Sequence, residues 1–146
     1  MPSMFFHDLS GADDPVWEQA FPVLQQLRTH LTREALAEVI AEGAPQGLRF
    51  TALFYRDKCV AVAGWRIIAN TNLRRVLYVD DLCVDETTRS HGYGQFLLNE
   101  LTRRAKEAGA RALDLDSGVQ RHAAHRFYLR NRFIISSHHF RLELPS

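Results

Sequence analysis

The spacing of hydrophobic residues predicts two helices in the first third of the chain. Apolar residues recur at helical intervals after Asp13-Asp14-Pro15, a capping carboxylate followed by proline, and again after Thr32. The two apolar sets are Val16, Ala20, Val23, Leu24 and Leu27, then Ala35, Leu36, Val39 and Ile40. The glycines and proline of residues 42–47 end the second helix. Residues 5–9, ahead of both, have the length of a short first strand.

The middle of the chain has the pattern of three β-strands. Residues 48–55 alternate loosely, residues 59–68 form a nearly continuous apolar run rich in β-branched side chains, and residues 74–84 form a third segment. The turns between them, at 56–58 and 69–72, are too short for a crossover connection. The three strands are therefore predicted to form an antiparallel meander.

The pattern changes after residue 84. The elements predicted there are a polar loop at 85–93, a helix at 94–108 that stops at Gly109, a short strand at 112–116, a helix at 120–130, and a closing hairpin of 133–137 and 140–144. A strand, loop, helix and strand in this order imply one parallel crossover. The predicted class is α/β, with a mixed central sheet (an antiparallel meander plus one parallel crossover) flanked by helices.

Length, charge and cysteine content narrow the function classes. A chain of 146 residues has the size of one domain, which we expect to span 1–146. The formal net charge of +1 gives no argument for a nucleic acid partner. No apolar run reaches the roughly 20 residues needed to span a membrane, and no signal peptide is apparent. Cys59 and Cys83 lie in apolar runs without a CxxC spacing, which indicates buried thiols in a reducing, cytoplasmic setting.

A glycine loop after the third strand of the meander carries the strongest functional signal. Gly92 and Gly94 let backbone N–H groups approach a ligand at the start of a helix, where the dipole favours anions, and Arg89 adds a positive charge. Together they predict a cradle for a diphosphate; the alternative is a glycine-rich turn that only caps the helix. The chain has neither a G-x-x-x-x-G-K-[ST] nor a G-x-G-x-x-G motif, which argues against nucleoside triphosphate and dinucleotide sites.

These residues resemble the motifs of the GNAT acetyltransferases. Arg89-x-x-Gly92-x-Gly94 is similar to the R/Q-x-x-G-x-G/A loop of that family, residues 77–84 to the strand before it, and residues 95–109 to the helix after it. Residues 124–128 resemble the family's A-x-x-F/L-Y segment. The resemblance implies acetyl-CoA as co-substrate, lying in a gap between two central parallel strands that diverge.

The resemblance also implies which residues hold acetyl-CoA. The backbone of Leu82, Cys83 and Val84 is expected to bond to the pantetheine arm like an added strand. The N–H groups of the loop are expected to bind the pyrophosphate, namely those of Ser90, His91, Gly92, Tyr93, Gly94 and Gln95. Arg121 stands where the family often has Asn, and is expected to contact a coenzyme phosphate or an acidic substrate group. Arg132 replaces a family glycine, a difference that concerns a bulge or turn more than chemistry.

Direct acetyl transfer in a ternary complex requires a proton acceptor for the amine and benefits from a donor for the leaving thiolate. Asp80 and Asp81 are the candidate bases, with a slight preference for Asp80; strand alternation sends them to opposite faces. The alternative is that either one pairs with an arginine such as Arg74 or Arg75. The resemblance makes Tyr128 the candidate acid, the alternative being a core aromatic residue.

The expected acceptor is a primary amine of a small molecule. Residues 121–128 resemble the R-H-x-A-H-R-F-Y stretch of aminoalkylphosphonate N-acetyltransferases, residues 137–140 are similar too, and Asp80 matches a carboxylate of spermidine/spermine-type relatives. Acetylation of a peptide or protein and a non-catalytic coenzyme A-binding module are the alternatives. His122 and His125 are spaced for a shared metal, but without a zinc pattern we predict none. Homodimers are common in the resembled family.

Overall fold

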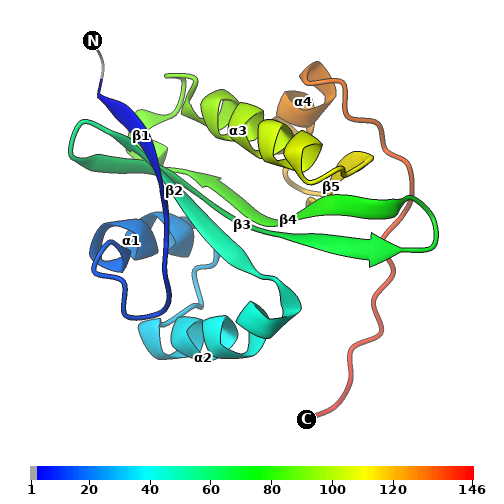
Figure 1. Ribbon diagram of the computed structural model, residues 1–146, viewed down its shortest axis with the longest axis horizontal. Coiled ribbons are helices and arrows are strands. Elements are labelled where there is room, and N and C mark those ends of the chain that lie inside the picture. Colours follow the sequence, from blue (N-terminus) through cyan, green and yellow to red (C-terminus); the bar gives the residue numbers. More distant parts are fainter. Residues whose placement is uncertain (1–2) are drawn as a thin grey trace. The chain divides into compact units, whose positions relative to one another are not determined.

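The computed structural model, which describes residues 3–146, contains a five-stranded sheet in the order β1-β2-β3-β4-β5 (Figure 1). The first four strands pair antiparallel in chain order, and β5 provides the one parallel pair. The strands are β1 (Met4–Asp8), β2 (Arg49–Tyr55), β3 (Lys58–Asn70), β4 (Arg74–Val84) and β5 (Ala112–Leu115). The predicted α/β class, the meander and the single crossover are confirmed.

The chain divides into two compact parts, and the first, up to Asp114, holds most of the sheet. Helices α1 (Trp17–Leu27) and α2 (Arg33–Gly43) cover one face, and α3 (Tyr93–Glu107) covers the other (Figure 1). The core beneath α1 and α2 includes Trp17, Leu24, Leu36, Phe50, Phe54, Val62 and Cys83. On α3, Leu97 and Leu101 are fully buried. Each sheet face thus has its own apolar layer, as the strand alternation requires.

The helix ends follow local chemistry. Thr32 caps α2 as predicted, because its Oγ1 accepts a hydrogen bond from the Ala35 N–H at 3.1 Å. Asp14 does not cap α1, which begins at Trp17; its carboxylate instead accepts bonds from the N–H groups of Ser10 and Val16 and fixes the preceding turn. Gly109, with φ +73°, follows the end of α3 as expected. A short 3₁₀ turn, η1 (Ala44–Gln46), follows α2.

The second part, Leu115–Ser146, contains α4 (His122–Arg130) and an extended tail. The predicted hairpin of 133–137 and 140–144 is wrong, since no residue from 133 to 146 is in a strand. The side chains that would have formed its apolar face lie in solvent: Ile134, Ile135, Phe140, Leu142 and Leu144 are 77–91% exposed. The alternation of these residues did not produce a strand, and nothing within the described part of this single chain covers their apolar side chains.

No helix among the described residues has both the length and the apolar character needed to cross a membrane.

Candidate functional site

The glycine loop forms an open turn at the N-terminus of α3. A 3₁₀ turn, η2 (Glu86–Thr88), leads from β4 into it, and Ser90 and Gly92 have φ angles of +78° and +81°. The N-cap residue of α3 is Gly92, and no side chain within the described residues caps the helix. A Cβ placed on Gly92 would meet nothing within 4 Å, so there is free space above the loop.

This geometry suits an anionic ligand. The first N–H groups of a helix have no partner inside the helix, and the N-cap residue here, Gly92, has no side chain to accept from them. Arg89 and His91 are exposed beside them, while the ring of His91 stacks on Tyr93 at 5.7 Å and its Nδ1 lies 2.8 Å from the Thr88 carbonyl oxygen. The loop therefore combines a formed backbone turn with a fixed positive charge, as a pyrophosphate site requires.

A β-bulge in β4 changes the expected arrangement of the two candidate bases. Asp81 pairs with Gly64 in the ladder, Val79 pairs with Trp65, and Asp80 between them has no partner in the register. Asp81 lies on the face covered by α1, because a Cβ on Gly64 would come within 3.2 Å of its Oδ2 and 2.8 Å of the Phe50 ring. The prediction that Asp80 and Asp81 point to opposite faces is therefore wrong: the extra residue interrupts the alternation.

Both carboxylates are paired with arginines on this one face. Asp80 receives two hydrogen bonds of 3.0 Å from Arg66 of β3, which lies on the same face as Gly64 two residues earlier. Asp81 receives a 2.7 Å bond from Nε of Arg28, the C-cap of α1, and Nη2 of Arg28 also donates to the Asp80 carbonyl oxygen at 3.1 Å. Both aspartates are thus paired with an arginine, as the alternative interpretation expected. The partners are Arg66 for Asp80 and Arg28 for Asp81, not the expected Arg74 or Arg75.

Asp81 is a stronger base than an ordinary aspartate. Burial raises the pKa of Asp81 above its ordinary value, and the charge of Asp80 adds to this, while Arg28 and Arg66 oppose it without cancelling it. The side chain of Asp81 is 15% exposed, against 45% for Arg28. Asp80 is held by the Arg66 guanidinium through two hydrogen bonds in a fork geometry. The raised pKa makes Asp81 the candidate proton acceptor of this pair.

Tyr128 lies on α4 in the second part of the chain. It is 9% exposed, and its ring contacts Phe127 and Phe133 at centroid distances of 5.4 Å. Burial raises the pKa of its phenol, and the charge of Arg121 partly offsets the shift. Its hydroxyl makes no hydrogen bond within the described residues, and its oxygen is not fully buried. The ring is therefore packed while the hydroxyl reaches the surface.

The histidines of α4 have local roles. His125 Nε2 lies 2.7 Å from the Gly118 carbonyl oxygen, and the rings of His122 and His125 meet edge to face at 6.0 Å. His139 pairs with Asp116 at 3.2 Å. Among residues 3–146, no three His, Cys, Asp or Glu side chains are grouped to hold a metal ion.

Sequence reasoning missed three polar residues that bear on this site. Arg28, Arg66 and Gln26 contact β4 or the loop after it from α1 and β3, and none belongs to a short motif. They are between 14 and 60 residues away in sequence from the groups they bind. Only the apolar faces of α1 and β3, which pack these elements against β4, carried a signal for their proximity.

Comparisons with known proteins identify the family. The model of the Acetyltransferase (GNAT) family matches residues 8–133. The chain is 32% identical over 127 residues to YhdJ of Bacillus subtilis (strain 168), described as an uncharacterized N-acetyltransferase; the match covers 86% of this chain and 89% of YhdJ.

Solved structures share the fold at low sequence identity. The aminoglycoside N-acetyltransferase AAC(6')-Iy in complex with CoA superposes with a TM-score of 0.82 at 14% identity, over 100% of this chain and 97% of the other. An acetyltransferase of Trypanosoma brucei gives a TM-score of 0.76 at 21% identity, over 97% and 100% of the two chains. With the family match and the loop geometry, these findings show that the chain belongs to the GNAT acetyltransferase family and is an acetyl-CoA-dependent N-acetyltransferase.

Proposed function

We propose that this enzyme acetylates the primary amine of a small molecule by direct attack in a ternary complex. One observation carries the proposal: Asp81, a carboxylate with a raised pKa, lies on β4 directly before the segment that leads into the glycine loop. A proton acceptor and a coenzyme-binding loop are thus built on one strand. A typical alkyl amine is protonated at neutral pH, with a pKa near ~10.4, so attack requires removal of a proton.

The proposed roles follow the order of the reaction. The protonated amine first gives one proton to Asp81, directly or through water. Its neutral nitrogen then attacks the thioester carbonyl carbon and the carbon–sulfur bond breaks, while the second proton of the nitrogen passes through water to the phenolate that Tyr128 leaves. Tyr128 gives its phenol proton to the leaving sulfur, since a buried phenol with a raised pKa is protonated at neutral pH. Asp80 keeps Arg66 in place and, on this proposal, is not the base.

The coenzyme is held by the groups that the family resemblance implies. The backbone of residues 82–84 binds the pantetheine arm, the N–H groups of residues 90–95 together with Arg89 bind the pyrophosphate, and Arg121 contacts a phosphate. The uncapped start of α3 and the free space at Gly92 support the pyrophosphate assignment.

The charge balance of the β4 carboxylates favours one class of acceptor. Each carboxylate already has an arginine, so this region offers no excess negative charge to a polycation. A small amine with a neutral polar group or an anionic group does not need excess negative charge. An anionic group can in addition bind Arg28, whose side chain is 45% exposed. Aminoglycosides and polyamines are therefore expected to be poorer acceptors, although aminoglycoside acetyltransferases share the fold.

We expect acetyl-CoA to raise the melting temperature of the protein in a saturable way, and small amines to release free thiol from it. The panel would contain aminophosphonates, amino acid-like amines, polyamines, an aminoglycoside and a lysine-containing peptide, assayed at equal concentration. The expected ranking by kcat/KM places amines with an anionic group first, by about tenfold or more over polycations. A peptide preferred over every small amine would contradict the small-molecule assignment. Coenzyme binding without turnover of any amine would favour a non-catalytic module.

We also propose that the enzyme is a homodimer in which the tails of two copies pair as antiparallel strands. Residues 140–144 alternate, with Phe140, Leu142 and Leu144 on one side and Arg141 and Glu143 on the other. If two copies pair about Leu142, each Arg141 lies opposite a Glu143 of the second copy, and Phe140 lies opposite Leu144. The tail is thus complementary to itself in charge and in apolar contacts, and this supports a second copy as the partner that covers it.

Charge reversal tests this register. Arg141→Glu alone turns both cross-strand pairs into like-charge pairs, and Glu143→Arg alone does the same, so each is expected to weaken dimerisation by about tenfold. The double variant Arg141→Glu/Glu143→Arg restores both pairs and should restore the dimer. Sedimentation equilibrium measures the dissociation constants. A monomeric wild-type protein, with the tail folded on its own chain, or single variants that dimerise normally would overturn the proposed pairing.

Two further assignments complete the proposal. The enzyme acts in the cytoplasm, a location that the two buried free thiols, Cys59 and Cys83, support because reducing compartments maintain thiols. The family match over residues 8–133 supports a single catalytic domain over residues 1–146.

A further inference from the structure

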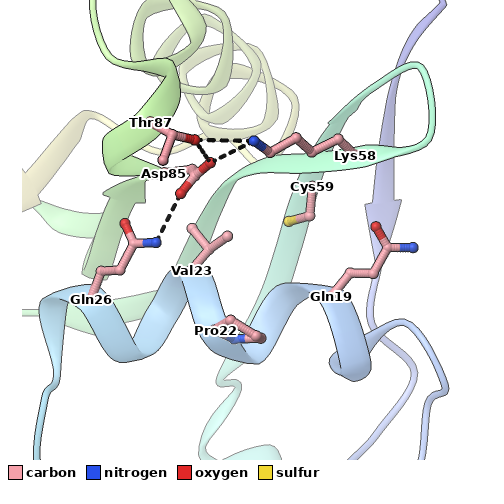
Figure 2. Close-up of a pocket in the computed structure, with 8 residues that line it drawn as sticks. All are labelled: Gln19, Pro22, Val23, Gln26, Lys58, Cys59, Asp85 and Thr87. Carbon is pink, nitrogen blue, oxygen red and sulfur yellow. Dashed lines mark hydrogen bonds and ion pairs between the residues drawn. The ribbon is translucent and has the colours of Figure 1, made fainter.

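One glutamine of α1 is bonded to both the side chain and the backbone at the start of the glycine loop. Nε2 of Gln26 donates to Oδ1 of Asp85 at 2.8 Å, and the N–H of Glu86 donates to Oε1 of Gln26, also at 2.8 Å. A single amide thus uses its donor and its acceptor on consecutive residues that lie about 60 positions away in sequence. Figure 2 shows the first of these bonds, with Gln26 reaching from α1 toward Asp85.

Asp85 is the centre of this arrangement. It is 6% exposed, and its carboxylate also accepts bonds from Oγ1 of Thr87 at 2.6 Å and pairs with Nζ of Lys58 at 3.2 Å (Figure 2). Its N–H donates to the Val60 carbonyl oxygen at 2.8 Å. Burial alone would raise the pKa of Asp85, but the bonds from Gln26, Thr87 and Lys58 outweigh it and lower the pKa to about 2. At neutral pH this residue is therefore a fixed anion at the point where β4 becomes the loop.

Hydrogen bonds hold the polar side of this junction. Gln26, Lys58, Asp85 and Thr87 line a hollow of about 350 Å³ between α1 and the β4 end, so the polar atoms stand at the wall of an accessible space. Lys58 is 57% exposed at its side chain. Loss of the Gln26 amide would consequently leave the loop start with two hydrogen bonds fewer.

We propose that Gln26 and Asp85 are positioning residues for acetyl-CoA, which hold the start of the glycine loop against α1 so that its N–H groups face the pyrophosphate. This rests on the proposed role of the loop. The same helix carries Arg28, which binds Asp81, and its Val23 carbonyl oxygen lies 3.0 Å from the Cys83 sulfur. Helix α1 and its C-cap therefore contact β4 at three places: at Asp81, at Cys83 within residues 82–84, and at the start of the glycine loop. These contacts fix the positions of the three segments relative to one another.

The test compares two glutamines of the same helix. Gln26→Leu removes both bonds at similar size, whereas Gln19→Leu changes a residue that lines the same hollow and whose side chain makes no hydrogen bond within the described chain. We expect Gln26→Leu to raise the dissociation constant of coenzyme A by about tenfold and Gln19→Leu to leave it unchanged. Pantetheine lacks the pyrophosphate, so its own affinity should be the same in the wild-type protein, Gln26→Leu and Gln19→Leu. Calorimetric titration gives the coenzyme A constants, and melting without ligand reports stability separately.

A second pair of variants guards against simple loss of folding. Gln26→Glu keeps the acceptor for the Glu86 N–H but sets a carboxylate against Asp85, and it should weaken coenzyme A binding further. Adding Asp85→Asn supplies an amide donor to the new Glu and should recover part of the affinity. Wild-type protein that fails to bind coenzyme A would remove the proposed role of the loop itself. Wild-type binding together with unchanged affinity in Gln26→Leu, equal losses for coenzyme A and pantetheine, or no recovery in the double variant would overturn the positioning role alone.

Discussion

Replacing Asp81 with asparagine is expected to lower kcat/KM by about 10²-fold or more with the best acceptor, since general base catalysis contributes typically 10²–10⁴-fold. The amide cannot accept the amine proton, yet it keeps the size and the hydrogen-bonding shape of the carboxylate. Asp80→Asn is the matched control: it makes the same chemical change one residue earlier, at a carboxylate bound to Arg66. Because Asp80 is proposed to position Arg66 only, its variant should lose much less activity.

A pH profile separates a base from a structural anchor. Kcat/KM should fall as the pH drops through the pKa of Asp81, which burial holds above the ordinary value. Arg28 lowers that pKa by its charge and its hydrogen bond, so Arg28→Gln should raise the pKa and move the acid limb to higher pH. An acid limb that stays in place in Arg28→Gln, or equal losses in Asp80→Asn and Asp81→Asn, would contradict the assignment of Asp81 as the base.

Replacing Tyr128 with phenylalanine is expected to lower kcat by about 10²-fold while leaving the affinity for coenzyme A nearly unchanged. The variant keeps the ring that packs on Phe127 and Phe133 and removes only the hydroxyl, which forms no hydrogen bond within the described residues. Stability should therefore change little. The measurements are steady-state kinetics with acetyl-CoA and a titration with coenzyme A.

The control for Tyr128 is Tyr55→Phe, which removes a phenol hydroxyl at the end of β2 and also keeps an aromatic contact, here with Tyr93 at 5.8 Å. It should retain wild-type kcat. If Tyr128→Phe also keeps wild-type kcat, the leaving thiolate receives its proton from another source, and the packing of Tyr128 is its main contribution.

Sequence patterns predicted the elements well where local chemistry decides them. The bounds of β4 agree with the prediction at both ends, and Thr32 and Gly109 act as the cap and stop that their residue types indicate. The glycine loop was also located correctly at the start of α3, because its chemistry lies in a short continuous segment. In contrast, Asp14 does not cap α1. Its carboxylate accepts hydrogen bonds from the N–H groups of Ser10 and Val16 and so fixes the turn before the helix.

The site was less predictable because its details depend on strand register and on partners distant in sequence. The bulge opposite Gly64 cannot be read from β4 alone, for it is the pairing with β3 that leaves Asp80 without a partner. The arginines that bind the two aspartates come from β3 and the end of α1. The tail shows another limit: its residues alternate, but none of them is in a strand, because alternation alone does not supply a neighbouring strand to pair with.

The bulge in β4 also bears on how this site can change by insertion and deletion during evolution. Asp80 is the extra residue of the ladder, so a deletion that removed it alone would leave every other side chain of β4 on its present face. Loss of any other single residue near it would have to be absorbed by the bulge or would turn the remainder of the strand over. The two neighbouring acids therefore differ in how easily evolution can remove them. Asp81 is part of the β3–β4 ladder, whereas Asp80 can be gained or lost by the insertion or deletion of one codon without a change of fold.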